Sequence, residues 1–323
     1  MKLTDGQRPG AGQHHSNRQR RAAPRDADAL RSARRAGLLS AALVLGSMAL
    51  PGTTASAAVT VGEHSRLALS DEAYLWGVAV MSARNAWAVG ADLVAPDTQF
   101  SAPLLAHWDG RSWTEITSGA LPLHGYLTGI TTFKGGAWAV GASGTHPNGT
   151  PGLHKPLIMR LTGSSWTRAP YSNKSGGHLT AVAASSPTNA WAVGSVMDDA
   201  GDGAQLIVHW NGWTWKRVPS PSPGGGPTTG PVVGPDNRLA AVSATSATSA
   251  WAVGWGSTRG LVYAPVILRW NGRSWKHVHA PDPSGGGFLD GIGIDPSGRA
   301  WAVGYTEDQL LPLLEHWDGS AWH

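Results

Sequence analysis

The pentapeptide Ala86-Trp87-Ala88-Val89-Gly90 occurs five times in this chain of 323 residues. Its central Trp residues follow one another at spacings of 51, 53, 60 and 50 residues. Repeats of about this length, built from short strands, are typical of β-propeller blades. The chain therefore consists of five units of one kind, centred on Trp87, Trp138, Trp191, Trp251 and Trp301.

Each unit shows the same order of predicted strands. An apolar run, 75–80 in the first unit, precedes a pentapeptide that alternates Ala with larger apolar residues, and both patterns predict β-strands. A third apolar run, 103–108, ends at Asp109-Gly110, a strong hairpin signal in which both residues are expected at positive φ. The fourth strand then opens with a Trp, and the five copies are Trp113, Trp166, Trp215, Trp275 and Trp322.

These segments predict an all-β fold, a β-propeller of five four-stranded antiparallel blades. A small sheet with apolar residues on both faces has to stack on its neighbours, and closing the stack into a ring protects the edges. The repeats fall at about 71–120, 121–172, 173–232, 233–283 and 284–323.

The fifth unit stops at Trp322-His323, where its fourth strand should begin. We expect an incomplete last blade or one closed by an N-terminal strand, for which 59–61 and 67–69 are the candidate segments. A chain that continues into further blades is the alternative.

The Trp residues are mostly repeated. Fourteen of the 17 occupy three recurring positions, and only Trp76, Trp213 and Trp255 do not. A ligand site needs a particular set of residues at one place, whereas a scaffold needs the same residue at the same position of every blade. The repeated Trp residues therefore indicate core packing.

A basic residue precedes the end of every third strand. The five are His107, Arg160, His209, Arg269 and His316. They form either a channel ring that binds anions or an inter-blade set that packs against neighbouring Trp rings, and the repetition favours packing.

Residues 1–57 are typical of an export signal. A long basic segment ends at Arg34-Arg35, an apolar run covers 36–50, and small residues at 55–57 suit cleavage. The apolar run is shorter than the roughly 20 residues of a membrane span, so we expect removal, no stable membrane span and a secreted 58–323 propeller domain. The sequence leaves open Sec or twin-arginine export.

The charge distribution argues against a nucleic-acid partner. Nine basic and three acidic residues lie in 1–57, which leaves 16 basic and 18 acidic residues in the propeller segment. The chain has no Cys, and no cofactor is expected.

One acidic loop deserves comparison with a calcium site. Asp198, Asp199 and Asp202 lie beside a Gly turn, but Ala200 holds a ligand position and His209 stands where a bidentate Glu is needed. We interpret the loop as a solvated turn and assign no metal and no catalytic residue.

The Trp late in each unit and the blade length resemble the kelch and galactose-oxidase central-domain type of propeller. The Trp-Ala-Val-Gly repeats also resemble those of uncharacterised secreted bacterial proteins. Resemblance to galactose oxidase would imply a copper radical site, which needs a Cys that this chain lacks.

The sequence predicts a secreted, non-catalytic binding module for an extracellular glycan or protein, because no nucleophile and base are recognisable. Whether it is an enzyme stays open, and the alternative is a propeller hydrolase or lyase with a dispersed site at the channel mouth.

Overall fold

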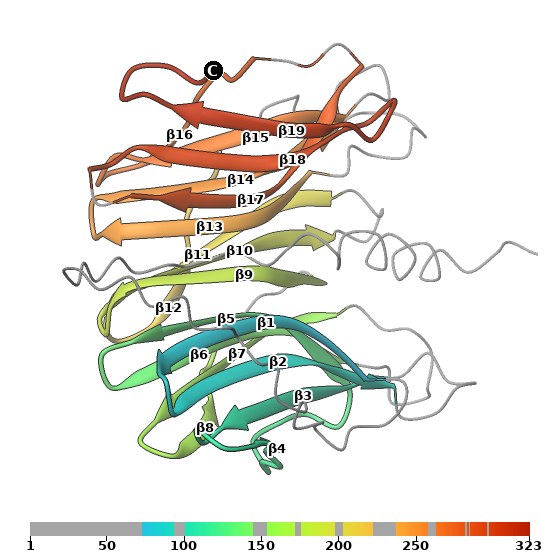
Figure 1. The fold of residues 1–323 in the computed structure, drawn as a ribbon, viewed down its shortest axis with the longest axis vertical. Helices are drawn as coiled ribbons and strands as arrows, with labels where there is room; N and C mark the ends of the chain where they lie inside the picture. Colours follow the sequence, from blue (N-terminus) through green and yellow to red (C-terminus); the bar gives the residue numbers. More distant parts are fainter. Residues whose placement is uncertain are drawn as a thin grey trace, which may run out of the picture. The chain divides into compact units, whose positions relative to one another are not determined.

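The computed structural model is all-β in the part of the chain that it describes (Figure 1). This part comprises 73–93, 101–144, 154–171, 176–197, 203–221, 237–257, 263–281, 283, 285–295 and 297–323. The predicted export signal, the segments 59–61 and 67–69, and the residues Asp198, Asp199 and Asp202 lie outside it. Within the described residues there is no helix long and apolar enough to cross a membrane.

Five antiparallel sheets, the blades, follow one another along the chain. Blade 1 consists of β1 (Ala73–Ser82), β2 (Asn85–Leu93), β3 (Ser101–Trp108) and β4 (Trp113–Glu115). Blade 2 consists of β5 (Gly125–Phe133), β6 (Gly136–Ser143), β7 (Lys155–Thr162) and β8 (Ser165–Arg168). Blade 3 consists of β9 (Gly176–Ser186), β10 (Asn189–Met197), β11 (Gly203–Trp210) and β12 (Trp215–Arg217). Blade 4 consists of β13 (Arg238–Ser246), β14 (Ser249–Ser257), β15 (Tyr263–Trp270) and β16 (Trp275–His277). Blade 5 consists of β17 (Gly287–Ile294), β18 (Ala300–Thr306) and β19 (Pro312–Trp317).

The prediction of an all-β propeller with five antiparallel blades is confirmed. Blades 1 to 4 have four strands each, and blade 5 has three. The fourth strand of blade 5 is nevertheless begun by the chain's own last residues. Trp322 pairs with Trp317, and His323 exchanges two backbone hydrogen bonds of 2.9 Å with His316.

The alternation of the pentapeptide explains how the blades stack. In blade 3, Ala190 and Ala192 pack in the core shared with blade 2, whereas Trp191 and Val193 pack in the core shared with blade 4. Because successive residues of a strand point to opposite faces, the small side chains face the preceding blade and the large ones the following blade. We call these two surfaces the backward and the forward face.

Four cores result, one between each pair of consecutive blades. In each, the pentapeptide Trp meets the fourth-strand Trp of the next blade, nearly edge to face; Trp191 and Trp275, for example, lie 5.1 Å apart at 87°. The forward face of blade 5 differs, because Trp301, Val303 and Leu314 are 48%, 44% and 62% exposed.

The Gly that ends the pentapeptide is fixed by a bulge in the first strand. The pairing register of β13 with β14 shifts between Leu239 and Ala241, next to Gly254. A Cβ on Gly254 would overlap the carbonyl group of Arg238, and the same holds at the other four copies. The repeated Gly is therefore a steric requirement within each blade.

The prediction that both residues of the Asp-Gly turn between the third and fourth strands have positive φ is wrong. Gly110 has a φ of 98°, as expected, but Leu310 is the one non-glycine residue with positive φ in the described part of the chain, so Asp109 does not share that conformation. The Asp109 Oδ1 atom instead accepts hydrogen bonds from the backbone N–H groups of Arg111 (2.7 Å) and Ser112 (2.8 Å). A side-chain acceptor thus shapes a four-residue turn where a two-residue turn was predicted.

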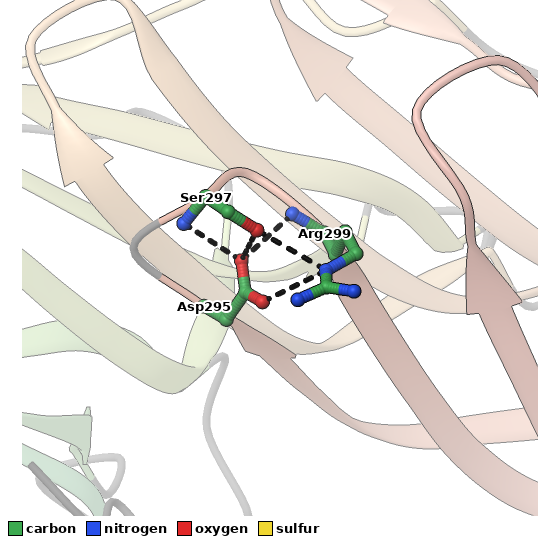
Figure 2. Close-up of polar contacts among 3 residues, drawn as sticks. All are labelled: Asp295, Ser297 and Arg299. Atoms are coloured by element: carbon green, nitrogen blue, oxygen red, sulfur yellow. Dashed lines mark hydrogen bonds and ion pairs between the residues drawn. The ribbon is translucent and has the colours of Figure 1, made fainter. Parts of the chain in front are cut away.

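Asp295 builds the first hairpin of blade 5 in a similar way (Figure 2). Its Oδ1 atom accepts hydrogen bonds from the backbone N–H and the hydroxyl of Ser297, at 2.8 and 2.6 Å, and from the backbone N–H of Arg299 at 3.0 Å. Its Oδ2 atom accepts one from the Arg299 Nε–H at 3.1 Å. These hydrogen bonds, the Ser297 hydroxyl first, lower the pKa of Asp295 to about 2.

Candidate functional site

One set of positions that vary between blades lies at the end of each blade where the chain enters it. First strands begin and second strands finish at this end, which we call the connection end because the chain passes there to the third strand and to the next blade. The residue before the repeated first-strand Leu differs in nearly every blade, and the copies are Tyr74, Tyr126, His178, Arg238 and Phe288. Residue identity at this end is therefore not dictated by the scaffold.

Second strands show a similar change after the repeated Gly. Ala91, Ala142 and Ser195 follow it in blades 1 to 3, whereas Trp255 and Tyr305 follow it in blades 4 and 5. Trp255 pairs with Arg238, and Tyr305 pairs with Phe288. The exchange of small residues for aromatic ones singles out blades 4 and 5.

Four aromatic rings meet at this place. The Phe288 ring lies 5.3 Å from Trp255, 5.1 Å from Tyr263 and 5.0 Å from Tyr305, measured between ring centroids. All four side chains are only half-buried. We call Trp255, Tyr263, Phe288 and Tyr305 the aromatic cluster; it offers ring surface to solvent while joining blades 4 and 5.

Charged groups lie beside the aromatic cluster. The Arg238 guanidinium carbon is 5.5 Å from the Trp255 ring centroid, and the buried Arg238 Nε has no hydrogen-bond partner in the part of the chain that the structure describes. Burial raises the pKa of Asp290, and the positive charge of Arg238 opposes that rise. Burial also raises the pKa of Tyr305, and the Asp290 charge adds to this rise. A guanidinium and a carboxyl group thus share one poorly solvated environment.

Two further contacts tie neighbouring blades to the site. The Glu307 Oε2 atom of blade 5 accepts a 2.8 Å hydrogen bond from the backbone N–H of Tyr263 in blade 4. His178 of blade 3 is half-buried, and its pKa is lowered to about 3 by burial first and then by the charges of Arg238 and His154. The imidazole therefore stays neutral beside Arg238 over the physiological pH range.

The five predicted basic positions lie away from this cluster, each against the pentapeptide Trp of its own blade. The Arg160 and Arg269 guanidinium carbons lie 5.1 Å from Trp138 and 5.2 Å from Trp251, respectively. The His107, His209 and His316 rings lie 4.3, 4.1 and 4.0 Å from Trp87, Trp191 and Trp301.

Two of these His residues also bond to an Asn of the same blade. His107 Nε2 is 3.1 Å from Asn85 Oδ1, and His209 Nε2 is 2.8 Å from Asn189 Oδ1. Burial lowers the pKa of His209. The two Arg residues, by contrast, also contact a Trp of the next blade, because Arg160 lies 5.3 Å from Trp210 and Arg269 lies 5.5 Å from Trp317.

Among the described residues, no group of three or more His, Asp or Glu side chains is arranged to hold a metal ion. The acidic loop 198–202 lies outside those residues, so its interpretation as a solvated turn stays a prediction.

The residues of the cluster and its charged neighbours were not singled out from the sequence. One signal was present, because Trp255 stood apart from the repeated Trp positions. The replacement of Ala or Ser by Trp and Tyr after the repeated Gly would have pointed to the same place.

Comparison with known proteins supports the fold. No family model matches the chain, and no curated protein matches it, so the resemblance to kelch and galactose-oxidase domains stays a prediction. A solved structure of a protein of unknown function from Dyadobacter fermentans matches with a TM-score of 0.50 and 13% identity, over 77% of this chain and 80% of that one.

Two other solved structures are similar at lower scores. YCF48 bound to a D1 peptide has a TM-score of 0.46 and 13% identity, over 79% of this chain and 69% of that one. Aleuria aurantia lectin has a TM-score of 0.40 and 12% identity, over 78% and 76%. At these identities the likeness concerns the fold and says nothing about a ligand.

Proposed function

We propose that this chain is a secreted, non-catalytic binding module, and that the aromatic cluster with Arg238 and Asp290 binds an extracellular glycan. The observation that carries the proposal is the buried Arg238 Nε, which has no hydrogen-bond partner among the described residues, beside half-buried aromatic rings. A buried donor without an acceptor costs about 1–3 kcal/mol, so a ligand oxygen at this point would be favoured.

Sugars match this combination of groups. Their C–H faces pack on aromatic rings, and their hydroxyl groups hydrogen-bond to guanidinium and carboxyl groups, which give stronger bonds than neutral partners. The export signal predicted for 1–57 supports an extracellular ligand.

The test is a glycan-array screen of the full chain with two variants. We expect selective binding by the wild type and a loss of about tenfold or more in affinity for Arg238→Gln, since a charge-assisted hydrogen bond contributes about 1.5–3 kcal/mol. Arg273→Gln removes an exposed Arg in a hairpin of blade 4 and should leave binding unchanged. Equal signals from all three proteins would contradict the proposal, and a blank array would favour a protein ligand.

A second candidate function rests on Asp290. A carboxyl group with a raised pKa beside Tyr305 and Arg238 has the character of a general acid in a hydrolase or lyase. Release of reducing ends from a polysaccharide, abolished by Asp290→Asn, would establish this alternative over simple binding.

A further inference from the structure

A groove separates the outer parts of blades 2 and 3, at the end of the blades opposite the aromatic cluster. It has a volume of about 190 Å³, and its lining includes Trp138, Arg160, Thr167, Arg168, Trp210 and Trp213. This is below the roughly 300 Å³ at which sites for drug-sized molecules begin, so the groove suits a single sugar ring or a group of similar size.

Trp213 stands at one side of the groove and is 88% exposed. The Asn211 Oδ1 atom accepts hydrogen bonds from the backbone N–H groups of Trp213 (3.1 Å) and Thr214 (3.0 Å), which fix the turn that carries the indole. Corresponding hairpin positions hold Arg111, Arg273 and Ser320. Blade 3 is therefore the one blade with a Trp at this hairpin position, and most of the indole is exposed.

Arg160 supplies a fixed positive charge to the same groove. Its guanidinium carbon lies between two indoles, 5.1 Å from the Trp138 centroid and 5.3 Å from the Trp210 centroid, and no described residue hydrogen-bonds to the buried Nε. Arg168 also borders the groove, but it pairs with Met159 on the face of blade 2 that packs on blade 1, and its Nη2 donates a 3.1 Å hydrogen bond to the Ser143 hydroxyl.

The ion pairs within the described residues are Arg299 with Asp295 and His323 with Asp318, so no carboxylate of this part of the chain neutralises Arg160 or Arg168. A planar guanidinium held between rings is well suited to a carboxylate, which it can bind through two parallel hydrogen bonds. The groove thus presents one guanidinium group, that of Arg160, and the exposed indole of Trp213.

We propose that the groove between blades 2 and 3 binds a carboxylated sugar, a uronic acid unit of an acidic glycan. The sugar ring packs on Trp213, and its carboxylate faces Arg160. This site lies between blades 2 and 3, at the end of the sheets opposite the connection end. The proposal therefore does not depend on the aromatic cluster.

The test compares methyl β-D-glucuronide with methyl β-D-glucoside by isothermal titration of the full chain. We expect the uronide to bind at least about tenfold more tightly, because the neutral sugar lacks the charge-assisted hydrogen bonds. Added salt should lower the affinity for the uronide, because salt screens the attraction between charges near the surface. Equal affinities, or no binding of the uronide, would overturn the proposal.

Variants locate the binding within the molecule. Trp213→Ala alters an exposed side chain and should weaken uronide binding about fivefold, and Arg160→Gln should weaken it about tenfold. The matched control is Arg269→Gln, because Arg269 lies between Trp251 (5.2 Å) and Trp317 (5.5 Å) in the same way, but the next blade has Ser320 at the hairpin position that corresponds to Trp213.

The control outcomes separate this site from the proposed glycan site. Arg269→Gln and Trp255→Ala should both leave uronide binding unchanged. Unchanged binding in Trp213→Ala, or an equal loss in Arg160→Gln and Arg269→Gln, would contradict the groove as the site.

Discussion

Blades 4 and 5 carry the same pentapeptide, yet its Trp has a different environment in each. Trp251 is 1% exposed and lies 5.2 Å from both Trp317 and Trp322 of the next blade. Trp301 is 48% exposed and stacks at 4.0 Å on His316 of its own blade. The pentapeptide therefore specifies a strand and the face on which its Trp lies, and the following blade supplies the burial.

The largest expected effect comes from removing these two indoles. Trp251→Ala should lower the free energy of unfolding by about 3–5 kcal/mol, because it leaves a cavity between blades 4 and 5. Trp301→Ala should cost only about 1 kcal/mol, since half of this side chain is already in water. Urea unfolding followed by circular dichroism measures both, and similar losses would show that burial by the next blade does not control the contribution of this Trp.

The repeated Gly sharpens the comparison because its constraint lies within one blade. Gly254→Ala and Gly304→Ala should each destabilise by about 2 kcal/mol, since either Cβ would overlap a first-strand carbonyl group. Gly293→Ala is the matched control, because no atom lies within 4 Å of its added Cβ. A large loss of stability in Gly254→Ala with none in Gly304→Ala would mean that the neighbouring blade, rather than the bulge, requires Gly at this position.

A smaller effect concerns pH and the connection end. The pKa of His178 is lowered to about 3 in the folded chain, where Arg238 and His154 face it, against about 6.5 when unfolded. The unfolded chain thus binds the proton more readily, so His178 contributes stability above pH 6.5 that is lost as the pH falls towards 3. His178→Tyr introduces the residue found in blades 1 and 2. It should reduce the stability lost between pH 7.5 and pH 5 by about 1–2 kcal/mol.

This dependence is measured by urea unfolding at pH 7.5 and pH 5. The wild type and His178→Tyr should differ in how much stability they lose between the two pH values. An identical loss in both proteins would assign the acid sensitivity to other groups.

The smallest expected effect is at Asp295, in the exposed hairpin shown in Figure 2. Its pKa is lowered to about 2 in the folded chain, against 3.8 when unfolded. Its hydrogen bonds therefore stabilise the folded chain above pH 3.8, and this stabilisation is lost as the pH falls from 3.8 to 2. Asp295→Asn should reduce the midpoint of thermal unfolding at pH 7 by about 2 °C or less. A much larger change would show that this turn has a greater part in blade 5 than its exposure indicates.

The scaffold could be predicted from the sequence because it repeats. Five copies of one pentapeptide gave the blade number, and their alternation indicated strands with two apolar faces. The hairpin geometry was missed because the Asp109 side chain, and not the backbone alone, shapes the turn.

The candidate site could not be predicted in the same way, because its members do not repeat. Arg238 and Tyr305 are far apart in sequence and meet only through strand register and blade stacking. The register in turn depends on the bulge after Leu239, which no local pattern identified. Repetition thus indicates packing, and the functional candidates lie where the repeat is interrupted.

The central claim is that non-repeated residues at the connection end form the ligand site while repeated residues form the scaffold. The most direct test is a glycan array probed with the full chain, Trp255→Ala and Trp301→Ala, two Trp residues that are both partly exposed in adjacent blades. The account predicts that Trp255→Ala loses the wild-type signals and that Trp301→Ala keeps them. Retention of every signal by Trp255→Ala, or their loss only in Trp301→Ala, would contradict it.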